Sequence, residues 1–405
     1  MSAKPTVAGA AAARAPAIPS CPVPDPLAPG AVVALLADLV RIPSTNPAIA
    51  PDEAHGEGAI AEFACGWLLA NGIRAWKEDA APGRPNVAAE IGEGGPALIL
   101  YGHLDTVGTA GMTIPPFEPR VEAGRLYGRG ATDMKGGVAA CMAAAAALAR
   151  ERLPGRVLLA LVADEEYESV GAADFVRRHR ADGCIVSESS EGDLILAHKG
   201  FVWADITTRG RAAHGSRFDL GVSAIARMGR IIAALDRFDA DTLRTRTAPL
   251  VGPASMHCAL VRGGVGLSTY APDCSLSIER RTLPGETGDQ VEEELKRVIQ
   301  EAGEEAEVSI RTVRRASHTA ADSPLAVSVR DAVRAVTGKV PRDKGAPYWM
   351  DSALFAEAGI PTVNYGPTGA SPHEAVEWVD VASVVGCAAI YVEAAHRFWG
   401  ARQED

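Results

Sequence analysis

The positions of apolar residues predict alternating strands and helices over the first half of the chain. Short, wholly apolar runs are typical of strands buried on both faces, whereas longer segments with one apolar face are typical of helices. The predicted strands are residues 86–91, 98–101, 157–163 and 184–187, and the predicted helices are residues 29–40, 56–71 and 138–151. This alternation predicts an α/β fold with a mostly parallel central sheet flanked by helices.

The pattern changes between residues 196 and 314, where apolar and polar residues alternate singly, as in half-exposed strands. The predicted strands here are residues 201–207, 254–261 and 275–281, and the amphipathic helices are residues 221–238 and 286–303. Two helices on one antiparallel sheet make a small α+β unit. Longer helices return at residues 327–336, 352–358 and 381–398. We therefore expect a larger domain, formed by residues 29–195 and 315–405, that is interrupted by an insert at residues 196–314.

Composition agrees with two soluble domains. A chain of 405 residues is too long for one ordinary core. Its 47% hydrophobic and 22% charged residues are typical of a soluble globular protein. The formal net charge of -11 argues against nucleic acid or an anionic membrane as partner, because both bind basic surfaces. No apolar run reaches the roughly 18 residues of a membrane span.

The N-terminal segment and the cysteines indicate an intracellular location. Residues 1–28 are rich in Ala and Pro and contain no continuous apolar segment, so we interpret them as a flexible leader and not as a secretory signal. The seven cysteines are odd in number, scattered and never spaced as Cys-x-x-Cys. Such cysteines are typical of small buried side chains in a reducing compartment, and we expect a cytoplasmic protein.

Histidines and carboxylates follow several predicted strands at the point where each strand ends. His103 and Asp105 follow one strand, and Glu165 with Glu166 follow another. Ligands of open α/β sheets bind beyond the carboxyl ends of the strands, so we expect these side chains to form one site. Further members are Asp133 in a glycine-rich segment before a helix, Glu188 after the strand at 184–187, and His373 after a strand that starts near residue 361.

Each of these residues has a structural alternative when it is considered alone. His103 with Asp105 could cap a loop, and Asp133 could be the N-cap of a helix. Two imidazoles and several carboxylates from five chain segments, with no thiolate, instead predict a site for two zinc ions, with cobalt or manganese as substitutes. One carboxylate would bridge the two ions, and one acid would remain as a base.

In their order along the chain these motifs resemble those of the M20 metallopeptidase family. This group includes acetylornithine deacetylase, succinyl-diaminopimelate desuccinylase, aminoacylase-1 and glutamate carboxypeptidase. The resemblance extends over nearly the whole chain after the leader. The motifs are Gly102-His-Leu-Asp105, Gly130-Ala-Thr-Asp-Met-Lys-Gly-Gly137, Asp164-Glu-Glu166, Glu188 and His373.

The resemblance implies a role for each residue of the site. Asp105 would be the partner of a zinc-binding histidine, and Glu165 would be the general base. Two zinc positions would share the bridging carboxylate of Asp133. The implied ligands are His103, Asp133 and Glu188 for one ion and Asp133, Glu166 and His373 for the other.

The resemblance also implies roles for residues of the insert. His214 resembles a histidine that reaches the active site of the neighbouring subunit, which implies a homodimer formed through residues 196–314. Arg281 occupies the family's Arg-x-x-Pro-Gly position and would bind a substrate carboxylate; the alternative is a surface ion pair with Glu279. Ser268 stands where many relatives have Asn, and we expect it to contact the substrate.

The predicted reaction is hydrolysis of an amide bond in an N-acyl amino acid or short peptide that has a free carboxylate. A bridging water needs no Ser or Cys nucleophile. One alternative is a metal-binding relative without catalysis, and the presence of Glu165 argues against it. The other is a two-metal phosphoesterase, which usually needs additional cations. The metal-bearing segments offer only Arg129, Lys135 and Lys199.

The remaining candidate residues have ordinary structural interpretations. Trp349 and Asp351 either line the site or mark the start of a helix. We interpret the other histidines as structural or surface residues: His55, His179, His198, His257, His318 and His396.

Overall fold

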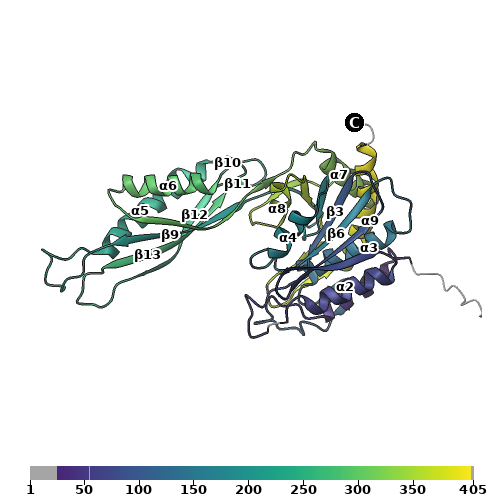
Figure 1. Cartoon of the computed structure of the whole chain (residues 1–405), viewed down its shortest axis with the longest axis horizontal. Coiled ribbons are helices and arrows are strands. Elements are labelled where there is room, and N and C mark those ends of the chain that lie inside the picture. The colour runs from purple at the N-terminus through teal and green to yellow at the C-terminus, as the bar shows by residue number, and fades with distance from the viewer. Residues whose placement is uncertain (1–24, 54, 403–405) are drawn as a thin grey trace, which may run out of the picture.

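The computed structural model describes residues 25–53 and 55–402. It consists of a larger and a smaller lobe, with the smaller lobe extending to one side (Figure 1). The predicted leader at residues 1–28 lies almost entirely outside the described residues. The helices of the larger lobe are α1 (Pro29–Arg41), α2 (Gly58–Ala70), α3 (Gly136–Leu148), α4 (Val170–Arg178), α7 (Pro324–Thr337), α8 (Ser352–Glu357) and α9 (Val381–Ala401).

A nine-stranded sheet forms the centre of the larger lobe. Its middle strands β6, β3, β7 and β17 run parallel to one another. At one edge β2 pairs antiparallel with β6, and β1 pairs antiparallel with β2. In spatial order the strands are β1 (Arg74–Ala81), β2 (Arg84–Ile91), β6 (Arg156–Val162), β3 (Ala97–His103), β7 (Gly183–Val186), β17 (Thr362–Asn364), β8 (Leu194–His198) and β15 (Ser317–His318), with β16 (Asp343–Ala346) paired to β8.

The strands and helices at the centre are apolar because they are covered on every side. Every residue of β3 is buried, and so is almost every residue of the alanine-rich helix α3. Small side chains let α3 approach the sheet closely. At Gly137 an added Cβ would lie 2.2 Å from the carbonyl oxygen of Ser187, so only glycine fits there. This contact brings the segment before α3 next to the end of β7.

Helix α9 has the length and composition of a membrane span but belongs to the core. Its mean hydropathy is 1.2 over the most apolar window. It packs against α3 and α7, and Tyr391, Phe398 and Trp399 on it are fully buried. Burial in the larger lobe therefore accounts for its apolar composition.

The smaller lobe is a four-stranded antiparallel sheet with two helices on one face (Figure 1). Residues alternate between the buried helix-covered face and the open face, as the single alternation of apolar and polar residues predicts. Its elements are the strands β12 (Ser255–Gly263), β13 (Asp273–Thr282), β9 (Gly200–Arg209) and β14 (Glu307–Arg314), the helices α5 (Ala224–Asp241) and α6 (Gly288–Glu301), and a short hairpin of β10 (Thr247–Ala248) and β11 (Gly252–Pro253).

The predicted fold class is confirmed, with differences in detail. The strand β8 at residues 194–198 pairs within the large sheet, so the insert sheet begins after it, at Gly200. The strands β1 and β14 were not predicted, because their exposed, charged residues hide the apolar alternation. Residues 108–130, for which no strand was predicted, contain a hairpin. That hairpin joins a separate sheet of β18 (Gly369–Ala370), β19 (Trp378–Asp380), β5 (Arg125–Tyr127) and β4 (Arg120–Glu122).

Candidate active site

The predicted metal ligands meet beyond the carboxyl ends of the parallel strands. His103 is the last residue of β3, and Glu188 follows β7 by two residues. Glu166 lies in the turn after β6, Asp133 precedes α3, and His373 lies in the turn between β18 and β19. The parallel pairing of these strands places their ends at one edge of the sheet, so five segments distant in the sequence share one site.

Asp133 stands between the two histidines. The Nε2 atom of His103 lies 3.0 Å from Oδ1 of Asp133 and 3.3 Å from Oε1 of Glu188. The Nε2 atom of His373 lies 3.1 Å from Oδ2 of Asp133 and 3.2 Å from Oε2 of Glu166. Each oxygen of Asp133 thus faces a different histidine, and each histidine also faces one further carboxylate.

The carboxylates of the site are crowded and shielded from water. Burial raises the pKa of Glu166 to about 7, with the charge of Asp133 adding to the effect. Burial likewise raises the pKa of Glu165 well above its usual range and raises the pKa of Glu188. Hydrogen bonds to Asp133 and Glu166 raise the pKa of His373 to about 10. The site therefore favours additional positive charge.

The side chains present fit divalent metal ions. Two groups of side chains have ligand atoms close enough to share an ion. Within each group these atoms lie within 4.8 Å of one another: His103, Asp133 and Glu166 in the first, and His103, Glu165 and Glu188 in the second. Oε1 of Glu166 is buried and has no hydrogen-bond partner within the described part of the chain. Such an orphaned carboxylate oxygen is costly unless a cation faces it. Imidazoles and carboxylates are the ligands that zinc and related ions take.

His103 and Asp105 are in contact, but not through the predicted side-chain pair. The Nδ1 atom of His103 lies 2.9 Å from the main-chain carbonyl oxygen of Asp105 and 3.6 Å from its carboxylate. The carboxylate instead accepts hydrogen bonds from the main-chain amides of Glu165, at 3.1 Å, and Glu166, at 3.2 Å. Asp105 therefore orients the histidine through its carbonyl group and holds the acid pair through its side chain.

The first acid of the triplet after β6, Asp164, has structural partners. Asp164 adopts a left-handed backbone conformation, with φ of 72°, and its carboxylate lies 2.8 Å from the guanidinium of Arg84. It also accepts a hydrogen bond of 3.0 Å from Asn46, which donates a second one of 2.8 Å to Asp105. Asn46 and Arg84 were not predicted, because each acts on a residue far away in the sequence.

Glu377 is the main positioning residue that the sequence did not reveal. Its buried carboxylate accepts hydrogen bonds of 2.9 Å from the amides of Gly130 and Thr132 and of 3.1 Å from that of Asp133. The guanidinium of Arg129 lies 2.8 Å from the same carboxylate. One side chain thus fixes the loop that presents Asp133. A sequence signal was absent, because Glu377 lies in an irregular segment after the His373 motif.

We expect Glu377→Gln to destabilise the protein by about 3–5 kcal/mol, because the buried guanidinium of Arg129 loses its counter-charge. The affinity for a divalent metal ion should fall as well, since the loop holding Asp133 is no longer fixed. Urea unfolding and zinc titration would measure the two effects. The exposed Glu374 of the same segment is the matched control, and Glu374→Gln should leave both quantities unchanged. Equal behaviour of the two variants would contradict the role of Glu377.

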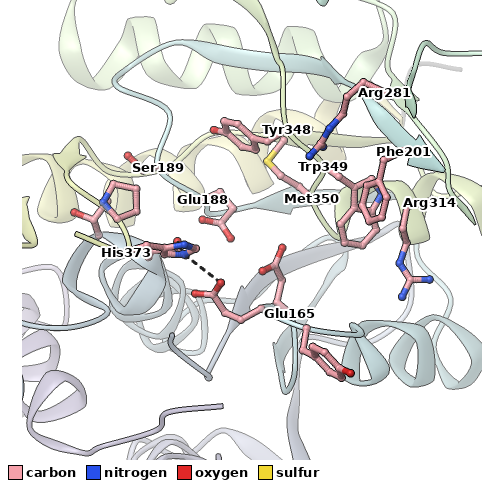
Figure 2. Close-up of a pocket in the computed structure, with 15 residues that line it drawn as sticks. Glu165, Glu188, Ser189, Phe201, Arg281, Arg314, Tyr348, Trp349, Met350 and His373 are labelled. Carbon is pink, nitrogen blue, oxygen red and sulfur yellow. Dashed lines mark hydrogen bonds and ion pairs between the residues drawn. The ribbon is translucent and has the colours of Figure 1, made fainter. Parts of the chain in front are cut away.

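A cavity of about 450 Å³ connects the metal ligands with the insert. Glu165 and Glu166 line it from the larger lobe, and Arg281 lines it from β13 (Figure 2). Arg281 lies on the open face of the insert sheet, and its Nε donates a hydrogen bond of 2.8 Å to Glu279. The guanidinium of Arg281 therefore both lines the cavity and makes the ion pair that was its alternative interpretation. Trp349 also lines this cavity, whereas Asp351 is buried behind it and accepts a hydrogen bond from Tyr101.

The structure does not bring His214 or Ser268 to this cavity. Both residues are exposed in the insert and lie beside each other, since the amide of Gly215 donates a hydrogen bond of 2.7 Å to the carbonyl oxygen of Ser268. The Nδ1 atom of His214 contacts the hydroxyl of Ser216 at 2.8 Å. Within one chain, therefore, these two residues do not line the cavity.

Comparisons with known proteins agree with this fold and show the family of the chain. Residues 99–397 match the family described as peptidase family M20/M25/M40. The chain is 30% identical to the acetylornithine deacetylase of Myxococcus xanthus, over 77% of this chain and 82% of the relative. It is 31% identical to a succinyl-diaminopimelate desuccinylase of Cereibacter sphaeroides, over 89% of this chain and 97% of the relative.

Solved structures share the fold at low sequence identity. Aminopeptidase PepT of Bacillus cereus superimposes with a TM-score of 0.76 at 20% identity, covering 93% of this chain and all of the other (100%). A dinuclear metal-binding peptidase of the M20 family from Bacillus subtilis gives a TM-score of 0.71 at 18% identity, covering 91% of this chain and 97% of the other.

An α/β domain with this site and an α+β insert defines a metal-dependent amidohydrolase. The chain belongs to peptidase family M20/M25/M40, as the match over residues 99–397 and the similarity to the Myxococcus xanthus enzyme show.

Proposed function

We propose that the protein hydrolyses the amide bond of an N-acyl amino acid, or of a short peptide, that has a free carboxylate, with two zinc ions as cofactors. The observation that carries this proposal is the placement of Asp133 between His103 and His373, at 3.0 and 3.1 Å. Two similar half-sites that share one carboxylate suit a pair of metal ions. Cobalt or manganese would fit the same ligands.

In the proposed mechanism Glu165 transfers the proton. When bound, two zinc ions would acidify a water molecule and polarise the scissile carbonyl group. Glu165 lines the cavity without belonging to the pairs around Asp133, so its carboxylate is placed to take a proton from a water molecule in the cavity. It would return this proton to the leaving amine. Arg281 would hold the substrate carboxylate with its guanidinium.

The phosphoesterase alternative is less well supported, because the three cations on the metal-bearing segments are engaged elsewhere. Arg129 pairs with Glu377, and Lys135 donates a hydrogen bond of 2.8 Å to the carbonyl oxygen of Ile42. Lys199 donates one of 2.5 Å to the carbonyl oxygen of Pro253. None of the three lines the cavity at the metal ligands.

A homodimer through the insert would complete the site with His214 and Ser268. Strand β12 is an edge strand of the insert sheet, and its side chains Leu260 and Val261 are 56% and 58% exposed. An unpaired edge with exposed apolar side chains is suited to pairing with a second copy. A symmetric dimer would then place each His214 near the partner's cavity, where it would donate a hydrogen bond to the developing oxyanion. We infer no role for nucleic acid or membrane.

The cysteines support a cytoplasmic location. The described cysteines are all free thiols, and most are buried. Free buried thiols are typical of a reducing compartment.

We expect zinc to stabilise the protein, because the five ligands come from segments that meet only after folding. Elemental analysis should find about two zinc ions per chain, as a two-metal site requires. The melting temperature should rise on adding zinc to chelator-treated protein. The zinc-loaded protein should release amine from N-acyl amino acids and release no phosphate from a phosphate ester. Protein that retains only a trace of metal after zinc loading would rule out the proposed cofactor.

A further inference from the structure

The insert sheet presents a row of three side chains to the cavity. Phe201 on the central strand β9 pairs directly with Arg281 on β13 and with Arg314 on β14. Directly paired residues project from the same face of a sheet. All three line the cavity that contains the metal ligands. The wall opposite the metal site thus holds two guanidinium groups on either side of one aromatic ring.

Aromatic rings hold both guanidinium groups in place. The guanidinium carbon of Arg281 lies 5.4 Å from the centre of the Phe201 ring, and that of Arg314 lies 5.5 Å from the centre of the Trp349 ring. The two rings contact each other edge to face, with centres 6.3 Å apart. Figure 2 shows Phe201 and Trp349 between the two arginines. Stacked guanidinium groups lose little freedom when they bind an anion.

The two arginines differ in their partners. Arg281 pairs with the carboxylate of Glu279 at 2.8 Å. The contacts of Arg314 are neutral: its Nη2 donates a hydrogen bond of 2.8 Å to the carbonyl oxygen of Glu168, and its guanidinium faces Trp349. Arg314 is half-buried and lines the cavity. Its charge is therefore uncompensated by these contacts and accessible to an anion in the cavity.

We propose that Arg314 is a specificity-determining residue that binds a second carboxylate of the substrate. The preferred substrates are then N-acyl amino acids with two carboxylates. This inference rests on the proposed function, because Arg281 takes the first carboxylate there. The strands of the two arginines are two positions apart in the sheet, a spacing of about 10 Å. The two arginine side chains extend from these strands into the same cavity. Their guanidinium groups can therefore bind two carboxylates that are a few bonds apart in one substrate molecule.

The second carboxylate could belong to the amino acid or to the acyl group, and paired substrates separate these sources. One pair is N-acetyl-glutamate and N-acetyl-glutamine. The other is N-succinyl-leucine and the analogue in which the free carboxylate of the succinyl group is a carboxamide. The members of each pair have nearly the same size and differ in one charge. We expect the zinc-loaded enzyme to prefer the charged member of at least one pair by tenfold to a hundredfold in kcat/KM, the range of a charge-assisted hydrogen bond.

Arg314→Gln should abolish this preference and change kcat/KM little for the neutral member of the pair. Arg314→Lys should restore part of it. The matched control is Arg311→Gln on the same strand, since Arg311 is exposed and does not line the cavity. An equal loss on charged and neutral substrates would instead mean that Arg314 only fastens the insert to Glu168, and would overturn the proposal. So would a wild-type enzyme that prefers neither charged member.

A binding measurement keeps this test independent of catalysis. Calorimetry would compare glutarate with 4-carbamoylbutanoate as ligands of the wild-type and Arg314→Gln proteins. Tighter binding of glutarate by about tenfold, lost in Arg314→Gln, would support the second carboxylate site even if none of the four substrates were hydrolysed. In that case the proposed reaction would fail and this inference would stand. Equal binding of the two ligands by the wild-type protein would refute the inference.

Discussion

Glu165→Gln is expected to lower the turnover number by at least about 10²–10⁴, because the substitution keeps the shape of the side chain and removes its basicity. The substituted amide cannot take a proton from water or return one to the leaving amine. The main chain should not move, since the amide of residue 165 still donates its hydrogen bond to Asp105. Zinc content and melting temperature should therefore stay close to those of the wild-type protein.

The neighbouring Glu166 is the matched control for this experiment. Its carboxylate lies 3.2 Å from His373, whereas Glu165 faces the cavity (Figure 2). Glu166→Gln should therefore lower the bound zinc, measured by elemental analysis, together with activity. A Glu165→Gln protein that loses zinc, beside a Glu166→Gln protein that keeps it, would show that the roles assigned to the two acids are reversed.

Mixing two inactive proteins, one with His214→Ala and one with Glu165→Ala, is expected to restore activity. Loss of one oxyanion donor usually costs about 2.7–4 kcal/mol in the barrier, so His214→Ala alone should be nearly inactive. His214 is exposed in the insert and does not line its own chain's cavity, which motivates a role in the partner's site.

The expected recovery follows from counting sites. At equal mixing half of the dimers are heterodimers, and each heterodimer has one of its two sites intact. Activity should therefore rise toward a quarter of the wild-type value. Mass spectrometry would verify that subunits exchange, and each variant incubated alone is the control. Exchange without recovery would mean that His214 acts within its own chain or has no role in catalysis.

The sequence predicted those parts of the molecule that local patterns determine. The apolar run before His103 fixed the strand and its end, and the same reasoning applied to Glu165 and Glu166 after β6. The parallel order of these strands then made a common site a reasonable expectation. The resemblance to M20 motifs implied the proposed division of the ligands between two metal ions, which spacing alone left open.

Positioning residues were predicted less well, because their effects depend on distant contacts. Asn46 reaches Asp105 and Asp164, and Glu377 reaches the loop of Asp133. Nothing in their local sequence distinguishes these side chains from ordinary surface residues. Arg314 was missed for a similar reason, since its place beside Phe201 depends on how β14 pairs with β9.

The chain enters and leaves the insert at one place. An added Cβ at Gly200, where β9 begins, would lie 2.3 Å from the carbonyl oxygen of Arg314, where β14 ends. A segment whose two ends are adjacent can be exchanged as a module without disturbing the domain that holds it. The metal ligands all lie outside this module, whereas Arg281 and Arg314 lie inside it. Transplanting the insert between relatives should therefore transfer substrate preference while Glu165 and the proposed metal ligands stay in place.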